Sequence, residues 1–152
     1  MSISKREIVT LARAGLYSEI KVVGKSMNPT LYENDKIKII TKENYEPGEV
    51  LAFSYKNDTL LVHRLLYIKK GIYYCKGDNS FRLEDVQKEQ IIGAVNEVNG
   101  IELEKWNDAK IALSYAVNRE FVRCKYNIFL VKKTNVYRKY IDEIREKVSE
   151  NV

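Results

Sequence analysis

The chain has 152 residues, of which 45% are apolar and 31% charged, a composition typical of one globular domain and not of a disordered, fibrous or multidomain chain. The formal net charge is +5, but residues 1–104 carry 15 basic and 15 acidic side chains, whereas residues 105–152 carry 11 basic and 6 acidic ones. The basic excess therefore lies entirely in the last third, and overall charge does not point to nucleic acid as a partner of the first two-thirds.

The first predicted elements are a short amphipathic helix and a series of strands. Residues 4–7 (SKRE) have the spacing of a capping box, and Gly15 supplies a stop for the helix. From Glu19 the apolar period changes to that of strands, which are expected at residues 20–22, 36–39, 50–53, 60–68, 72–75 and 91–98. Short connections rich in turn-forming residues favour antiparallel hairpins over βαβ crossovers. Residues 1–104 are therefore predicted to form one β domain behind an N-terminal helix.

After Trp106 the pattern returns to that of helices. Asn107 or Asp108 can cap a first helix, and residues 126–131 form an apolar run whose secondary structure the pattern leaves open. A second helix is indicated by apolar residues at three- and four-residue intervals, namely Tyr137, Tyr140, Ile141, Ile144 and Val148. Residues 105–152 are thus predicted as a basic helical extension, and the fold class as mainly β (α+β).

No segment marks the chain for a membrane or for export. The longest apolar runs are a few residues long, far short of the about 20 needed to cross a bilayer, and the N-terminus lacks the apolar region of a signal peptide. Cys75 and Cys124 have no CxxC spacing and no neighbouring histidine, which favours reduced buried thiols over a metal site or a disulfide. We therefore expect a soluble cytoplasmic protein without a metal or organic cofactor.

The chain has one histidine, His63, within an expected strand. A serine is a poor nucleophile unless a histidine lies within hydrogen-bonding reach and a carboxylate fixes the tautomer of the imidazole. A lone histidine in a strand is also typical of a structural role. Any catalytic device of the Ser-His type in this chain must use His63.

Two further segments contain the other residue types that a serine hydrolase of the Ser-His-Asp type requires. Ser26 lies in residues 24–31 (GKSMNPTL), directly after a strand and before a proline-directed turn, where a side chain can be held on rigid backbone. Carboxylates that could orient the histidine follow in residues 76–85 (KGDNSFRLED). Each segment alone is also typical of an ordinary turn, but together they have the order Ser, His, Asp inside one β domain. The absence of GxSxG argues against an α/β-hydrolase.

These segments resemble the conserved boxes of type I signal peptidases. Residues 24–31 resemble the nucleophile box, residues 62–64 (VHR) the general-base box of the branch that uses histidine, and residues 76–79 (KGDN) the acidic box of that branch. Residues 46–53 (EPGEVLAF) look like the Gly-acidic-Val strand of the family. The resemblance spans roughly residues 20 to 98, and four boxes in series are far more specific than one.

The resemblance implies the antiparallel β fold that signal peptidases share with the SOS-repressor peptidases. Ser26 would attack a peptide carbonyl and His63 would act as general base. Asp85, or else Asp78, would orient the base, with Asp78 favoured for holding the turn and Glu84 an alternative to Asp85 because loop length varies by one. Gly24 stands where relatives often carry a hydroxyl residue, so the backbone amide of Ser26 is expected to supply more of the oxyanion stabilisation.

The expected function is therefore that of a soluble serine endopeptidase that cleaves a leader or precursor peptide. A non-catalytic peptide-binding or accessory module on the same fold is the alternative. A self-cleaving repressor ranks last, because the residues before the β domain are too few for a helix-turn-helix and His63 replaces the lysine of that branch. The basic tail could contact anionic lipid headgroups, an accessory protein or RNA, or could be the solvated side of helices packed on the β domain, and nucleic acid is the less favoured partner.

Overall fold

The computed structural model describes residue 10, residues 18–56 and residues 59–149. The opening helix expected from the capping box at residues 4–7 lies outside these residues, apart from Thr10. Across the described ranges, no helix combines the length and the apolar character that a membrane span requires.

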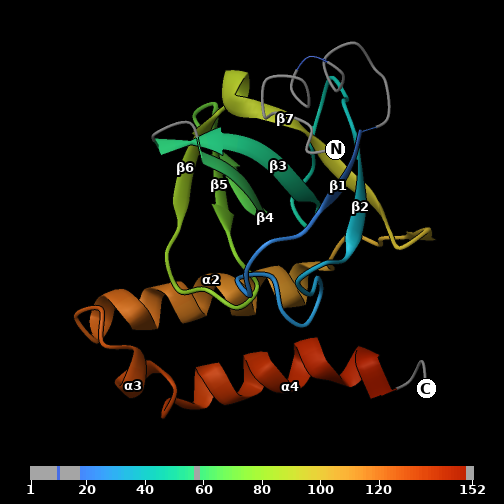
Figure 1. The fold of residues 1–152 in the computed structure, drawn as a ribbon. Helices are drawn as coiled ribbons and strands as arrows, with labels where there is room; N and C mark the ends of the chain where they lie inside the picture. Colours follow the sequence, from blue (N-terminus) through green and yellow to red (C-terminus); the bar gives the residue numbers. More distant parts are fainter. Residues whose placement is uncertain (1–9, 11–17, 57–58, 150–152) are drawn as a thin grey trace.

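An antiparallel sheet is the largest unit of the described structure (Figure 1). Its strands are β1 (Ser18–Lys21), β2 (Lys36–Ile40), β3 (Val50–Tyr55), β4 (Thr59–Lys69), β5 (Ile72–Lys76), β6 (Glu84–Gln87), β7 (Ile91–Val98) and β8 (Ile101–Glu102). They are hydrogen-bonded in the order β1-β2-β7-β3-β4-β5-β6, and β8 pairs with β7. A 3-10 turn, η2 (Lys88–Gln90), precedes β7. The mainly β class is confirmed, and every expected strand is present.

Two strands were not expected from the sequence. The four residues of β6 read EDVQ and the two of β8 read IE, so neither shows an apolar alternation that would have identified it. Both become strands by pairing with a longer neighbour, β6 with β5 and β8 with β7. The segment of candidate carboxylates, residues 76–85, therefore ends inside a strand, because β6 begins at Glu84.

The central strand β3 is buried on both faces and separates two parts of the core. Val50 and Ala52 pack into one apolar cluster, whereas Leu51 and Phe53, which point the other way, pack into a second. The first cluster also receives Met27 from the loop between β1 and β2. Its burial ties that loop to the sheet.

Three helices follow the sheet: α2 (Asp108–Arg123), α3 (Ile128–Val131) and α4 (Asn135–Ser149). Both predicted tail helices are confirmed, although the side chain of Val148 lies outside the described part, and α3 occupies the run whose state the sequence left open. Asn107 is the cap of α2, because its side chain accepts a hydrogen bond from the Lys110 N–H at 3.0 Å. In Figure 1, α2 lies below the sheet with α4 beyond it, and the β1–β2 and β5–β6 loops reach down to these helices.

Candidate active site

Ser26 and His63 meet at the end of the sheet that faces the helices. His63 lies in β4, paired with Leu51 of β3, and Ser26 lies in the loop between β1 and β2. The Ser26 Oγ is 3.0 Å from the His63 Nε2, which is hydrogen-bonding distance. His63 is only 6% exposed. The structure therefore brings together the two side chains that the sequence singled out as nucleophile and base.

A carboxylate lies on the other nitrogen of the imidazole, and it belongs to Glu84. Its Oε2 is 3.0 Å from the His63 Nδ1, and both side chains are largely buried. Within the described part of the chain neither atom makes a well-aligned hydrogen bond, so the pair is close without ideal geometry.

Asp85, the residue favoured for this position from the sequence, does not lie on His63, whereas Glu84, the alternative, does. Successive residues of a strand point to opposite faces, and in β6 Glu84 and Val86 are buried whereas Asp85 is exposed. The Asp85 Oδ1 lies instead 3.4 Å from the Tyr55 hydroxyl. Pairing of Glu84 with Cys75 of β5 sets this register.

Asp78 does not reach His63 either, but forms a buried ion pair with Arg64. The Arg64 Nη2 lies 2.7 Å from the Asp78 Oδ2, and its Nε donates to the Oδ1 at 3.2 Å. Thr30, from the loop that carries Ser26, donates its hydroxyl to the same carboxylate at 2.6 Å. Asp78 therefore ties the β5–β6 loop to the loop between β1 and β2, residues 22–35, which carries the candidate nucleophile Ser26 and is called the nucleophile loop.

The residues next to Asp78 hold the backbone of Ser26 directly. The Asn79 N–H donates to the Ser26 carbonyl at 2.8 Å, and the Asn79 side-chain amide donates to the Lys25 carbonyl at 3.1 Å. The Ser80 N–H closes the turn on the Gly77 carbonyl at 3.0 Å. The KGDN segment thus acts as a clamp on the nucleophile loop.

The helical extension, residues 105–152, also contacts this clamp through Tyr140, and its partner Arg64 through Trp106. The Tyr140 hydroxyl of α4 donates to the Asp78 carbonyl at 2.5 Å, and the Arg64 guanidinium lies 3.9 Å from the ring centre of Trp106. Fully buried Lys76 donates to the Gly77 carbonyl at 2.9 Å. Burial lowers the pKa of Lys76 to about 8, although the negative charges of Asp78 and Glu84 act in the opposite direction. The extension and the β domain therefore share one buried polar network, which the sequence did not indicate.

Gly77 is needed because the site leaves no room for a side chain there. A Cβ at this position would lie 2.6 Å from the Ser26 carbonyl oxygen and 3.1 Å from the His63 Nε2. We expect Gly77→Ala to displace Ser26 from His63. The rate at which Ser26 reacts with a fluorophosphonate probe should then fall by about 10²-fold, a loss typical of a misplacement near 1 Å.

The control for Gly77→Ala is Gly71→Ala in the turn between β4 and β5. A Cβ at Gly71 meets no atom within 4 Å, although its φ of +75° makes the substitution strained. This variant should lose stability while its folded form keeps the wild-type rate. Equal rates for Gly77→Ala and wild type would contradict the crowding argument.

Gly24 has a backbone reason for not being a hydroxyl residue. Its φ is +85°, in the left-handed region that favours glycine, so a serine there would be strained. The peptide between Lys25 and Ser26 is held by the Asn79 side chain, which donates to the Lys25 carbonyl. That the Ser26 N–H of this peptide donates to an oxyanion stays a prediction.

An apolar pocket of about 250 Å³ opens beside Ser26 and His63. Most of its wall comes from β1, β2 and β4 and from the nucleophile loop, including Ile20, Val22, Leu31, Ile37, Leu60 and Val62. A group placed on Ser26 would therefore have an apolar cavity next to it, which suits an uncharged side chain.

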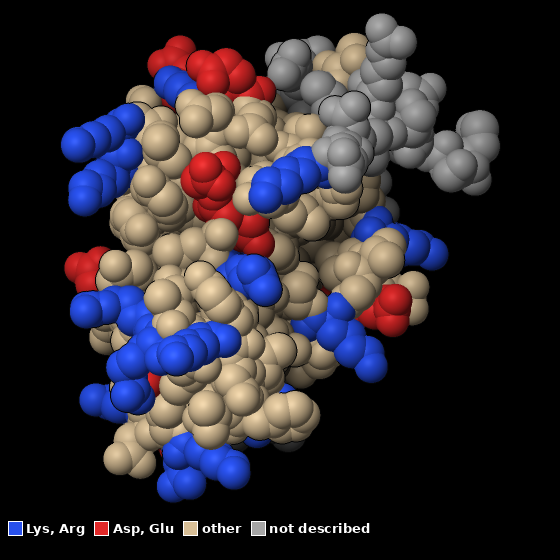
Figure 2. Space-filling view, turned by 90° about the vertical axis from the view of Figure 1, so that its left-hand side faces the viewer, with Lys and Arg blue, Asp and Glu red and all other residues tan. Residues whose placement is uncertain are grey.

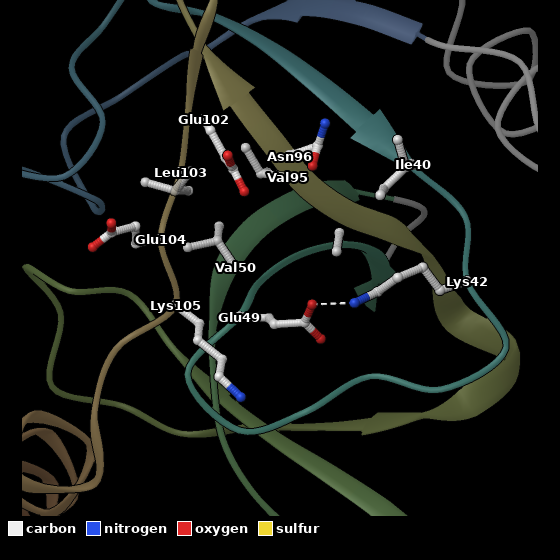
Figure 3. Close-up of a pocket in the computed structure, with 11 residues that line it drawn as sticks. Ile40, Lys42, Glu49, Val50, Val95, Asn96, Glu102, Leu103, Glu104 and Lys105 are labelled. Carbon is white, nitrogen blue, oxygen red and sulfur yellow. Dashed lines mark hydrogen bonds and ion pairs between the residues drawn. The ribbon is translucent and has the colours of Figure 1, made fainter.

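A separate pocket of about 430 Å³ lies between β3, β7 and β8 (Figure 3). It is mixed in character, with Val50 and Leu103 on its wall and an ion pair between Lys42 and Glu49 across it. None of the candidate catalytic residues lines it. Within the described ranges, no three His, Cys, Asp or Glu side chains are grouped as metal ligands, and both cysteines are free thiols.

Comparison of the sequence with protein-family models and with curated proteins gives no match.

Proposed function

We propose that this chain is a serine endopeptidase similar to type I signal peptidases of the histidine branch, and that it cleaves a peptide bond in a leader or precursor peptide. The observation that carries the proposal is the line of three side chains in which Ser26 lies 3.0 Å from one nitrogen of His63 and Glu84 lies 3.0 Å from the other. Nucleophile, base and orienting carboxylate in this order are the parts that acyl transfer requires.

Each group then has one task. Glu84 favours the tautomer with the proton on Nδ1, which leaves Nε2 of His63 free to accept the proton of Ser26. As that proton leaves, the Ser26 Oγ bonds to the substrate carbonyl carbon and the carbonyl oxygen becomes an oxyanion. The imidazolium next gives its proton to the leaving amine, and the peptide C–N bond breaks. A water molecule, deprotonated by His63 in turn, hydrolyses the resulting ester and restores Ser26.

The surroundings of the site suit a peptide substrate. The amide of Ser26 can donate to the oxyanion, and the apolar pocket beside the serine can receive a side chain next to the scissile bond. Hydrogen bonds of Thr30 and Asn79 hold the nucleophile loop at fixed points, which limits its motion during the reaction.

A fluorophosphonate probe tests this proposal directly. The Ser26 Oγ would displace fluoride from the phosphorus atom, forming a stable phosphonate ester that intact-mass spectrometry detects. We expect one label per chain, no label in Ser26→Ala, and normal labelling in the control Ser80→Ala, which changes a neighbouring serine. Candidate precursor peptides should be cleaved by wild type and by Ser80→Ala but not by Ser26→Ala.

The peptidase proposal would be contradicted if the folded wild-type protein neither reacted with the probe nor cleaved any candidate peptide. Peptide binding by such a protein would instead support the non-catalytic recognition module, which keeps the pocket and the sheet without using the reactivity of Ser26.

A further inference from the structure

The corner between α2 and α4 exposes an unusual run of apolar side chains. The exposed fractions are 80% for Phe129, 60% for Tyr126, 52% for Val122, 48% for Leu130 and 43% for Ile128. We call residues 122–133 the α3 corner. Large apolar side chains are commonly exposed singly, but several in succession mark an interaction surface.

The α3 corner is built to stay in this conformation. Val131 is fully buried in the cluster between the helices, and the Asn127 side chain accepts from the Leu130 N–H at 3.2 Å. Lys125 and Tyr126 have φ values of +54° and +64°, in the left-handed region that non-glycine residues seldom adopt. They close α2 as a left-handed helix cap, in which the Tyr126 N–H donates to the Phe121 carbonyl at 2.8 Å and the Lys125 N–H to the Val122 carbonyl at 3.0 Å. The end of α2 and the start of α3 are thus both fixed by hydrogen bonds.

The charged side chains of the segment that forms the corner are all basic, although Arg123 pairs with Glu120 of α2. Residues 121–141 contain six Lys and Arg and no Asp or Glu. Lys125, Lys132 and Lys133 are all exposed and flank the apolar run on both sides. Figure 2 shows Lys and Arg side chains spread among uncharged surface over the lower half of this face, which is the helical half.

We propose that the α3 corner docks on the surface of an anionic lipid bilayer. Phe129, Leu130 and Ile128 would enter the boundary between headgroups and acyl chains, and the flanking lysines would contact the negatively charged headgroups. A nucleic acid would satisfy the lysines but would offer no apolar medium for the aliphatic side chains. The combination of an apolar tip with a basic rim therefore fits a membrane surface better.

Docking at this corner would place the candidate active site close to the membrane. A pocket of about 430 Å³ runs from Val122 and Tyr126 to Glu84, the carboxylate on His63. Arg82 lies along it, 5.5 Å from the ring centre of Tyr126. The membrane contact itself does not depend on the proposed peptidase chemistry, so Ser26→Ala should bind vesicles as wild type does.

Vesicle flotation of the full chain tests the docking. Wild type should float with phosphatidylcholine vesicles that contain about 30% phosphatidylserine, and much less with pure phosphatidylcholine, because lysines near an anionic surface each add to the affinity. Phe129→Ser/Leu130→Ser should lower the partition coefficient by about tenfold or more through lost apolar burial. The control Ile101→Ser removes a 73% exposed apolar side chain of β8 and should bind as wild type.

The lysines are tested with a matched pair of double variants. Lys132→Gln/Lys133→Gln should lower binding to anionic vesicles by about tenfold, whereas Lys69→Gln/Lys70→Gln, an exposed pair where β4 enters the β4–β5 turn, should have no effect. Phe129→Trp should show a blue shift of its fluorescence on the same vesicles if the tip enters the bilayer.

Several outcomes of these experiments would overturn membrane docking at the α3 corner. Absence of flotation with anionic vesicles at low salt would overturn it, as would equal losses in the test and control variants. Binding of single-stranded RNA without vesicle binding would assign the corner to nucleic acid instead. A dimer in sedimentation that Phe129→Ser/Leu130→Ser dissociates, again without vesicle binding, would assign it to a second copy of the chain.

Discussion

Glu84→Gln should slow the reaction of Ser26 by about 10²–10⁴-fold, the range expected when a histidine base loses the carboxylate that orients it. Glutamine has nearly the same shape, so the fold should remain, but a neutral amide neither stabilises the imidazolium nor selects the tautomer with the proton on Nδ1. The second-order rate constant for fluorophosphonate labelling measures this loss, and the rate of peptide cleavage provides a second reading.

Asp85→Asn is the matched control, because it makes the same chemical change one residue along the same strand. Asp85 is exposed and faces Tyr55, so the labelling rate should stay within about twofold of wild type, as for most surface changes. A large loss in Asp85→Asn together with a small one in Glu84→Gln would show that β6 pairs with β5 one residue out of the register described here.

Asp78→Ala should lower the free energy of unfolding by about 3–5 kcal/mol, the cost of removing one partner of a buried ion pair. The Arg64 guanidinium would remain fully buried without its carboxylate, and the Thr30 hydroxyl would lose its acceptor. Lys76 would also lose one of the negative charges that oppose the lowering of its pKa. Urea unfolding at pH 7 measures the change. The slope of the free energy of unfolding against urea concentration should stay that of wild type if unfolding remains two-state.

Two further variants separate the buried pair from charge effects in general. The double variant Arg64→Met/Asp78→Ala removes both charges and should regain much of the stability, because no unpaired charge is left inside. Glu46→Ala removes one partner of the exposed pair with Lys105 and should change stability little. A mild effect of Asp78→Ala, similar to that of Glu46→Ala, would contradict the clamp described for the nucleophile loop.

Local patterns in the sequence were sufficient for most of the secondary structure and for two members of the candidate site. Period-two runs such as residues 36–39 and 50–53 became strands, and helical spacing together with the Asn107 cap located α2 and α4. His63 could be named because the chain has no other histidine, and Ser26 because it follows a strand and precedes a turn. These inferences need only neighbouring residues.

The third member of the site could not be obtained in that way. The strand β6 is short and charged, so it has no pattern of its own and exists through its hydrogen bonds to β5. Whether Glu84 or Asp85 faces His63 depends on the register of that pairing, because a shift of one residue exchanges the two faces of a strand.

By itself the sequence determined the mainly β class, the helical tail, the location of the basic excess and the pair Ser26 and His63. Only the tertiary structure decided that Glu84 lies on the imidazole, that Asp78 is held by Arg64, and that Tyr140 of the tail bonds to the carbonyl of Asp78. The physical reason is distance along the chain: Tyr140 and Asp78 are separated by 62 positions, and no local periodicity carries information on which buried polar groups will meet.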